Sequence, residues 1–407
     1  MNRITRILFI VSLFAILAII PISFCGEYIY ISTIIELFYI IAICITVRLS
    51  FDKNEKKLGI IILLYSFTAL INLFFIRNRS IIYTLNKIIP IVFMYIIIGY
   101  SNRYKIELKK TIKWIQFIMN FIVIASFIMY IIGYSSIRIE NGAIQFIPNS
   151  FFQTSYGESR LAWIFTHKSR FAILCFLNIG FLLNNRYIKS KTKKVCILIS
   201  LFDIYLSSSK TILGIAIIVM GIAYLNNNFI TKKEKLLKYS VSIFLIIFIV
   251  NIIPKIIKVL SNTRDVASLG GRLYIWEAGI RKAINNFWGI GQFDNSNWLT
   301  TEKLPGGVYT HAHNMFINEI IERGILPGLF FILIFLYLIF MYKNRINKNI
   351  LIGCILSSFM DNTLTSELSY VFWFIMLINY LYEKEILNKV YNVKGEKIEE
   401  ESLSNRT

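Results

Sequence analysis

Long apolar runs alternate with short polar segments along almost the whole chain. A hydrocarbon core about 30 Å thick takes about 20 apolar residues at a rise of about 1.5 Å per residue. Runs near this length therefore predict membrane-spanning helices. We expect twelve, with approximate bounds 7–24, 28–47, 58–76, 80–100, 112–134, 169–183, 195–206, 211–225, 236–253, 326–342, 350–362 and 368–382. The runs at 195 and 350 are short, so either could be a re-entrant element instead.

The first run resembles a signal peptide, because Arg3 and Arg6 precede it and Cys25-Gly26 follows it. It is longer than a typical signal-peptide core, and no small-residue cleavage pattern precedes Cys25. We therefore favour a retained anchor over a lipoprotein signal.

Composition supports the membrane interpretation. The chain has 407 residues, is 56% hydrophobic and has a mean hydropathy of +0.62, whereas soluble domains are about 45–50% apolar even with glycine counted. The net charge of +21 suggests nucleic acid at first, but the basic residues lie between apolar runs and do not form one polar face. Placing both termini in the cytoplasm puts most basic residues on the inner side. The sequence predicts an all-α integral membrane protein with no nucleic-acid partner.

The predicted spans divide the chain into four parts. Residues 1–253 hold nine spans, with an outer segment near 135–168, and residues 254–325 form a large outer loop. Residues 326–382 hold the last three spans, and the charged tail 383–407 is typical of a disordered cytoplasmic extension. A long loop without low complexity is often functional, so we expect the chemistry in 254–325.

The chain has three histidines, all on the predicted outer side. His167 precedes a span, while His311 and His313 flank Ala312 just before a helix near residue 315. Histidine accepts a proton near neutral pH, so this pair is a candidate general base. A helix cap is the structural alternative. A metal site is the other, but it would need further ligands without the usual spacing, from Glu319, Glu322 or Asp294.

Cations give a second signal. Lys210 lies in Ser207-Ser208-Ser209-Lys210-Thr211 at the outer end of a span, where a charge is costly unless it reaches the interface or meets an anion. Arg272 follows Gly270-Gly271 and opens an amphipathic stretch. A guanidinium beside a helix start suits phosphate oxygens, although a turn glycine with a solvated arginine has the same spacing. Nucleotide-binding and nucleophile-elbow motifs are absent from the sequence, and no cofactor is expected.

The order of several motifs carries a family resemblance. Arg272 and Trp276 share one predicted helix, Gly289-Ile290-Gly291 follows, and His313-Asn314 precedes Glu322 and Gly324 at the start of a span. This series, within residues 261–330, resembles the O-antigen ligase and polymerase (Wzy-like) superfamily. The segment around Lys210 is similar to the family's Ser-Arg-Ser/Thr element. Arg160 with residues 163–167 is similar to a motif before a middle span of many polysaccharide polymerases.

The resemblance implies a membrane glycosyltransferase of the GT-C type that takes an undecaprenyl diphosphate-linked glycan as donor at the outer face of the cytoplasmic membrane. It implies that Arg272 and Lys210 bind the diphosphate and that His313 acts as base or positions the acceptor, without a metal. Lys210 replaces the usual family arginine and offers a point charge instead of a bidentate fork. Further substrate-binding residues are expected at His311, Asn314, Arg160, His167 and Glu322.

Three functions compete. A polymerase of O-antigen, capsule or exopolysaccharide repeat units leads, with a glycan or lipid-linked acceptor and with a chain-length regulator and a flippase as candidate partners. A ligase that transfers the finished glycan to lipid A-core or another surface acceptor has nearly the same motifs. A flippase or other transporter is the third, because twelve spans also suit transport and Glu36 and Asp203 are candidates for buried charges within them.

Overall fold

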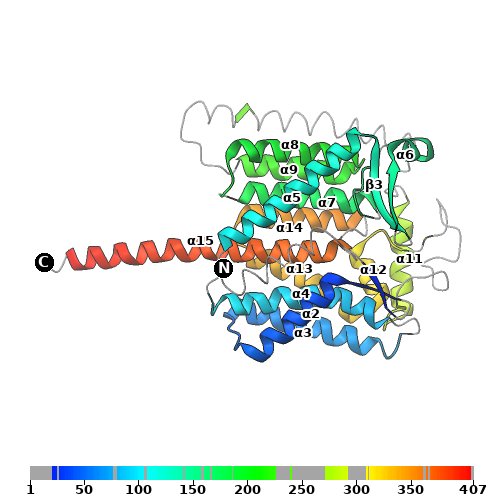
Figure 1. Ribbon diagram of the computed structural model, residues 1–407. Helices are drawn as coiled ribbons and strands as arrows, with labels where there is room; N and C mark the ends of the chain where they lie inside the picture. Colours follow the sequence, from blue (N-terminus) through cyan, green and yellow to red (C-terminus); the bar gives the residue numbers. More distant parts are fainter. Residues whose placement is uncertain are drawn as a thin grey trace.

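A computed structural model gives the fold. It describes residues 21–24, 27–76, 80–104, 108–140, 143–156, 160–165, 167–185, 187–225, 239–240, 271–291, 309, 311–360, 364 and 367–404. Most of these residues are helical. The long helices lie side by side in one bundle (Figure 1). They are α2 (Ile31–Thr46), α3 (Lys53–Asn72), α4 (Ile81–Ser101), α5 (Leu108–Ile131), α7 (Lys168–Asn184), α8 (Ser190–Leu206), α9 (Lys210–Leu225), α13 (Ile325–Met341), α14 (Arg345–Met360) and α15 (Glu367–Ser404).

Each of these helices overlaps one of the predicted apolar runs. The predicted span 236–253 lies outside the described residues, apart from residues 239–240, and so does most of the span 7–24. Where the first run is described, the prediction of a helix is wrong: strand β1 (Pro21–Phe24) pairs antiparallel with strand β2 (Glu27–Tyr30). Proline inside a helix loses a backbone hydrogen bond, whereas the first position of a strand tolerates it.

Membrane-length helices are fewer than the apolar runs. Among the described residues, α4 and α5 are long and apolar enough to cross a membrane, while α2, α9 and α13 are apolar but shorter. Other helices carry charges within their length, as at Lys53 and Lys56 in the first turn of α3. The all-helical bundle is thus confirmed, and twelve membrane spans are not.

The two ends of the bundle differ in character. Figure 1 shows the short elements gathered at the end where α5 and α8 finish and α7, α9 and α13 begin, which we call the loop end. These elements are strands β3 (Tyr134–Glu140) and β4 (Ala143–Pro148), which form a hairpin, and helices α6 (Asn149–Tyr156), α11 (Arg272–Asn285) and α12 (Met315–Arg323). The opposite end, called the basic end, carries lysines and arginines in or beside the first turns of α3, α5, α8 and α14.

An aromatic core connects the loop end to the bundle. Phe335 of α13 packs against Phe372 and Trp373 of α15, with ring centroids 5.6 and 5.2 Å apart. Phe316 of α12 packs edge to face on Phe335 at 5.5 Å. Trp373 and Phe335 are almost fully buried. The short helix α12 is therefore inserted into the main core and does not rest on its surface.

The last helix continues beyond the bundle (Figure 1). The prediction of disorder for the tail is wrong for residues 383–404, which extend α15. Its first tail residues are fixed by contacts at the basic end. Buried Glu383 accepts hydrogen bonds from the backbone N–H groups of Lys343 and Asn344, and Lys384 bonds the buried Glu55 at 2.7 Å. Composition alone does not reveal these partners.

Candidate active site

The predicted site residues lie at the loop end, mostly where helices begin. Lys210 and Arg272 are the first residues of α9 and α11. His167 and Asn314 are the N-caps of α7 and α12, and Glu322 lies in the last turn of α12. Helix N-termini carry partial positive charge and open N–H groups, which attract anions. The topology thus directs several helix starts, two of them with a cationic side chain, toward one end of the bundle.

One group forms around the turn between α8 and α9. The backbone N–H of Leu161 donates to the carbonyl of Leu206, the last residue of α8, at 3.2 Å. This bond places Arg160 beside the turn that leads to Lys210. Ser208 in that turn has a left-handed φ of 53°, and Lys210 is exposed. The structure brings the predicted Arg160 and Lys210 segments together.

His167 begins the neighbouring helix α7, which packs against α9. Its Nδ1 accepts a hydrogen bond from the backbone N–H of Ser169 at 3.3 Å, so it acts as a helix cap. Its imidazole is exposed. The structural alternative for this histidine is therefore present, and its role in substrate binding stays a prediction.

The second group is the histidine loop, residues 309 and 311–314. The rings of His311 and His313 lie 4.2 Å apart between centroids, and the ring of Tyr309 is 6.2 Å from that of His313. Both histidines are half-buried. His313 has a φ of 47°, in the left-handed region. Such a conformation costs on the order of 1–3 kcal/mol and persists only where the surroundings fix it.

Two asparagines of α12 fix this loop. Asn314 Oδ1 accepts from the backbone N–H groups of Phe316 and Ile317 at 3.0 and 3.1 Å, which caps the helix. Asn318 Oδ1 accepts from the N–H of Ala312 at 2.7 Å. Ala312 is fully buried between the two histidines. Because the amide oxygen of Asn314 is used in the cap, its predicted contact with substrate stays untested.

Helix α11 packs directly on this unit. A Cβ at Gly279 would lie 2.9 Å from Ile317 of α12 and 3.6 Å from Ala312, so only glycine permits the approach. Ile275 is buried on the same face. Arg272 precedes Ile275 by three residues and Gly279 by seven, which places it on this face as well. The structure therefore joins the predicted Arg272 and the histidine loop in one packed unit.

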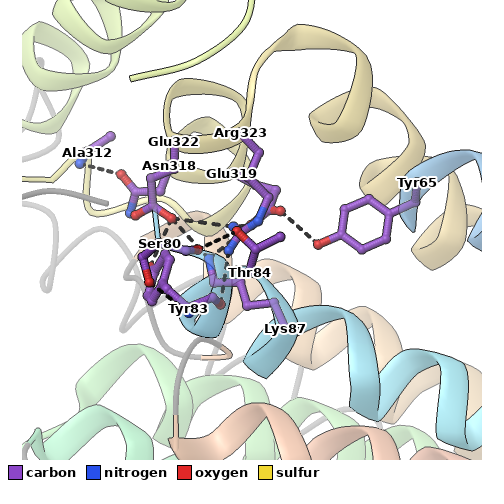
Figure 2. Close-up of polar contacts among 10 residues, drawn as sticks. All are labelled: Tyr65, Ser80, Tyr83, Thr84, Lys87, Ala312, Asn318, Glu319, Glu322 and Arg323. Atoms are coloured by element: carbon purple, nitrogen blue, oxygen red, sulfur yellow. Dashed lines mark hydrogen bonds and ion pairs between the residues drawn. The ribbon is translucent and has the colours of Figure 1, made fainter. Parts of the chain in front are cut away.

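A buried ion cluster anchors α12 to α4 (Figure 2). Lys87 Nζ lies 3.0 Å from Glu319 Oε2 and 3.1 Å from Glu322 Oε2, and Arg323 Nη1 lies 2.8 Å from Glu319 Oε2. All four side chains are at most 6% exposed. Two cations balance two carboxylates. Burial of charge at this depth is costly unless ion pairing and hydrogen bonds compensate it.

Tyrosines complete the cluster. Tyr65 of α3 donates to Glu319 and Tyr83 of α4 donates to Glu322, each at 2.9 Å. Burial alone would raise the pKa of Glu319, but the charges of Arg323 and Lys87 outweigh it and lower that pKa below its usual range. Glu319 is thus held as a carboxylate. Glu319 and Glu322 bond these partners, and Asp294 lies outside the described residues.

Lys87, Arg323 and both tyrosines were not predicted from the sequence. One signal was present, because Lys87 interrupts an apolar run, and a charge within a span indicates a partner or a function. The identity of that partner, more than 200 residues away, is visible only in the fold.

The glycines of the family motif make a backbone contact. The N–H groups of Ile290 and Gly291 donate to the carbonyls of Ile321 and Glu322 at 2.9 Å, which satisfies the end of α12. Gly289 has a φ of +93°, and a Cβ there would lie 2.6 Å from the nitrogen of Gly324. The Gly289-Ile290-Gly291 segment is therefore a cap that holds α12 from its C-terminal side.

Together the fold and the site define a helical membrane protein with a cationic and histidine-bearing site at one end. The sequence model of a family described as O-antigen ligase matches residues 195–333, from α8 into α13. This match supports membership of the O-antigen ligase superfamily through residues 195–333, and the predicted resemblance is confirmed there. Members are membrane-integral ligases or polymerases related to glycosyltransferases. No curated protein matches the chain.

Replacing Gly324 by alanine is expected to destabilise the protein. Gly324 joins α12 to α13 with a φ of +101°, and a Cβ there would meet Asn72 and lie 2.7 Å from the carbonyl oxygen of Phe287. The left-handed backbone alone costs on the order of 1–3 kcal/mol. Thermal unfolding of the detergent-purified protein measures the effect. Gly214→Ala in α9 is the matched control, because its Cβ would meet nothing within 4 Å; equal unfolding temperatures for the two variants would contradict the proposed contact.

Replacing Lys87 by methionine is expected to lower stability by about 3–5 kcal/mol, because buried Glu319 and Glu322 then share a single cation. Arg281→Met is the control, since it removes an exposed cation paired with Glu277 at 2.8 Å and should change little. Both variants are compared by thermal unfolding at neutral pH. A Lys87→Met protein as stable as the control would show that the cluster does not anchor α12.

Proposed function

We propose that this protein is a glycosyltransferase that polymerises undecaprenyl diphosphate-linked repeat units at the outer face of the cytoplasmic membrane. The main support is the arrangement of the loop end. There the Arg160 and Lys210 segments lie together, and Arg272 shares a packed unit with His311 and His313. The family match covers the second unit and Lys210.

The reaction needs one base and a cationic cradle. An acceptor hydroxyl oxygen attacks the anomeric carbon of the donor glycan, its proton passes to His313, and the bond from that carbon to the diphosphate oxygen breaks. Negative charge then develops on the departing lipid diphosphate. Arg272 and Lys210 stabilise this charge, with Arg160 and His167 close to Lys210 in the fold. In this mechanism the base and the cations are all side chains of this protein.

The charge distribution supports a cytoplasmic basic end. Lysines and arginines gather in or beside the first turns of α3, α5, α8 and α14, as expected for inner loops. In this orientation the loop end faces outward, where the lipid-linked glycan is presented after flipping. A flippase that supplies the donor and a chain-length regulator are the partners this reaction calls for.

Removing the proposed base or cation should abolish transfer. We expect His313→Ala to lower turnover by about 10²–10⁴-fold and Arg272→Ala by about 10²–10³-fold, measured with purified protein and an undecaprenyl diphosphate-linked repeat unit in detergent. Arg281→Ala is the control, because Arg281 is an exposed cation on the same helix as Arg272. Undiminished turnover of His313→Ala would contradict its role. Failure of Arg272→Ala to accumulate would favour a structural role for that arginine.

Deletion of the gene should separate polymerase from ligase. A polymerase mutant leaves single repeat units on the surface acceptor, because the units still transfer but no longer extend. A ligase mutant instead leaves full-length chains on undecaprenyl diphosphate. Electrophoresis of surface glycan and analysis of the lipid-linked pool distinguish the two, and the second pattern would replace our proposal with the ligase alternative.

A further inference from the structure

A small, partly open pocket lies where α4 meets the end of α12. Its lining includes Ser80, Tyr83 and Thr84 at the start of α4, Gly291 of the glycine cap, and Glu322 and Arg323 of α12, with two apolar residues that follow α3. Figure 2 shows the side chains of α4 beside those of α12. The pocket has about 10 Å³ of free space, enough for about one oxygen-sized group.

Two residues of this pocket leave hydrogen-bonding capacity unused. Glu322 accepts from Tyr83 and Lys87 through Oε2, and among the described residues nothing donates to its Oε1. Arg323 uses Nη1 on Glu319, while its Nε–H is buried and has no acceptor in the described part of the chain. Arg323 is 2% exposed and Glu322 is 4% exposed. The buried Nε–H of Arg323 is costly without a partner, so a group that accepts from it and also donates to Glu322 Oε1 would bind favourably.

The kind of group that this pocket can bind follows from the charge of its lining and from the hydrogen-bond donor and acceptor that it offers. Lys87 and Arg323 balance Glu319 and Glu322, so the cluster favours neither a phosphate nor a cation. The unused pair consists of one acceptor and one donor. A hydroxyl group is donor and acceptor in one atom and has the right size.

We infer that this pocket is a sugar subsite that receives one hydroxyl of the glycan, which accepts from Arg323 Nε–H and donates to Glu322 Oε1. The inference rests on the proposed function and extends it, because it assigns a neutral sugar to a site distinct from the cations that meet the diphosphate. Tyr83 and Lys87 are then positioning residues, since they hold the Glu322 carboxylate through its other oxygen.

The place of the pocket indicates which sugar it reads. Asn314, next to His313, and Glu322 lie eight residues apart on α12, about 12 Å along its axis. A glycan with its reacting bond at His313 therefore reaches the pocket with a sugar that takes no part in the bond exchange. Binding at such a remote position contributes to specificity for the repeat unit.

Ser80→Thr tests this subsite without disturbing the ion cluster. Ser80 caps α4 by accepting from the N–H of Tyr83 at 2.9 Å, and threonine keeps that hydroxyl while its added methyl group fills the pocket. We expect the variant to bind an undecaprenyl diphosphate-linked repeat unit about tenfold more weakly, the loss of roughly one charged hydrogen bond. Ser101→Thr is the matched control, because it adds the same methyl group at the other end of α4, where Ser101 donates to the carbonyl of Ile98.

A second ligand identifies the source of the hydroxyl. Undecaprenyl diphosphate without sugar should bind wild type and Ser80→Thr equally, because it has no hydroxyl to place. If Ser80→Thr binds the repeat-unit lipid as tightly as wild type does, the pocket holds only water and the inference is wrong. Equal weakening for both ligands would also overturn it, since the pocket would then not read sugar.

Binding is measured separately from turnover. A wild-type protein that binds the repeat-unit lipid but transfers nothing contradicts the proposed enzyme, while the comparison of Ser80→Thr with wild type still decides the subsite. The two failures are therefore distinguishable.

Discussion

The pairing of Lys87 with Glu319 and Glu322 is the interaction on which the loop end depends. Helix α12 has nine residues, too few for a stable isolated helix, so its place is set by its surroundings. The ion cluster holds it from α4, the aromatic core holds it at Phe316, and the glycine cap closes its last turn. The histidine loop is in turn bonded to α12 through Asn314 and Asn318. The geometry of the histidines thus depends on a charge balance farther along the same helix.

Helices were predictable because a membrane imposes their length. The run at 80–100 became α4 (Ile81–Ser101), and the run at 169–183 became α7 (Lys168–Asn184). Errors occurred where apolar composition was the only guide. Pro21 lies in an apolar run but begins a strand, and the charged tail is helical because Glu383 and Lys384 are fixed by residues of other helices. Such contacts join distant segments and leave no local trace in the sequence.

The motif residues of the candidate site were predictable from the sequence, but the contacts that hold them in place were not. Order along the chain indicated that Arg272 and His313 belong together, and their packing through Gly279 agrees with that. The sequence did not reveal that His167 and Asn314 cap helices, although a cap was the structural alternative for the histidines. The glycine motif could not be understood from sequence either, because its contact is made by backbone atoms of two segments more than 30 residues apart.

Because the ion cluster is buried, its charges respond to salt differently from the exposed charges of the same site. Mobile ions screen charges that water reaches, with a Debye length of about 8 Å at physiological ionic strength, and they screen buried pairs much less. Lys210 is exposed, whereas Lys87 and its partners are at most 6% exposed. Salt therefore weakens the attraction of Lys210 for an anionic ligand while the scaffold beneath the histidines keeps its strength. Ionic strength therefore affects ligand binding at Lys210 much more than it affects the ion cluster that supports the histidine loop.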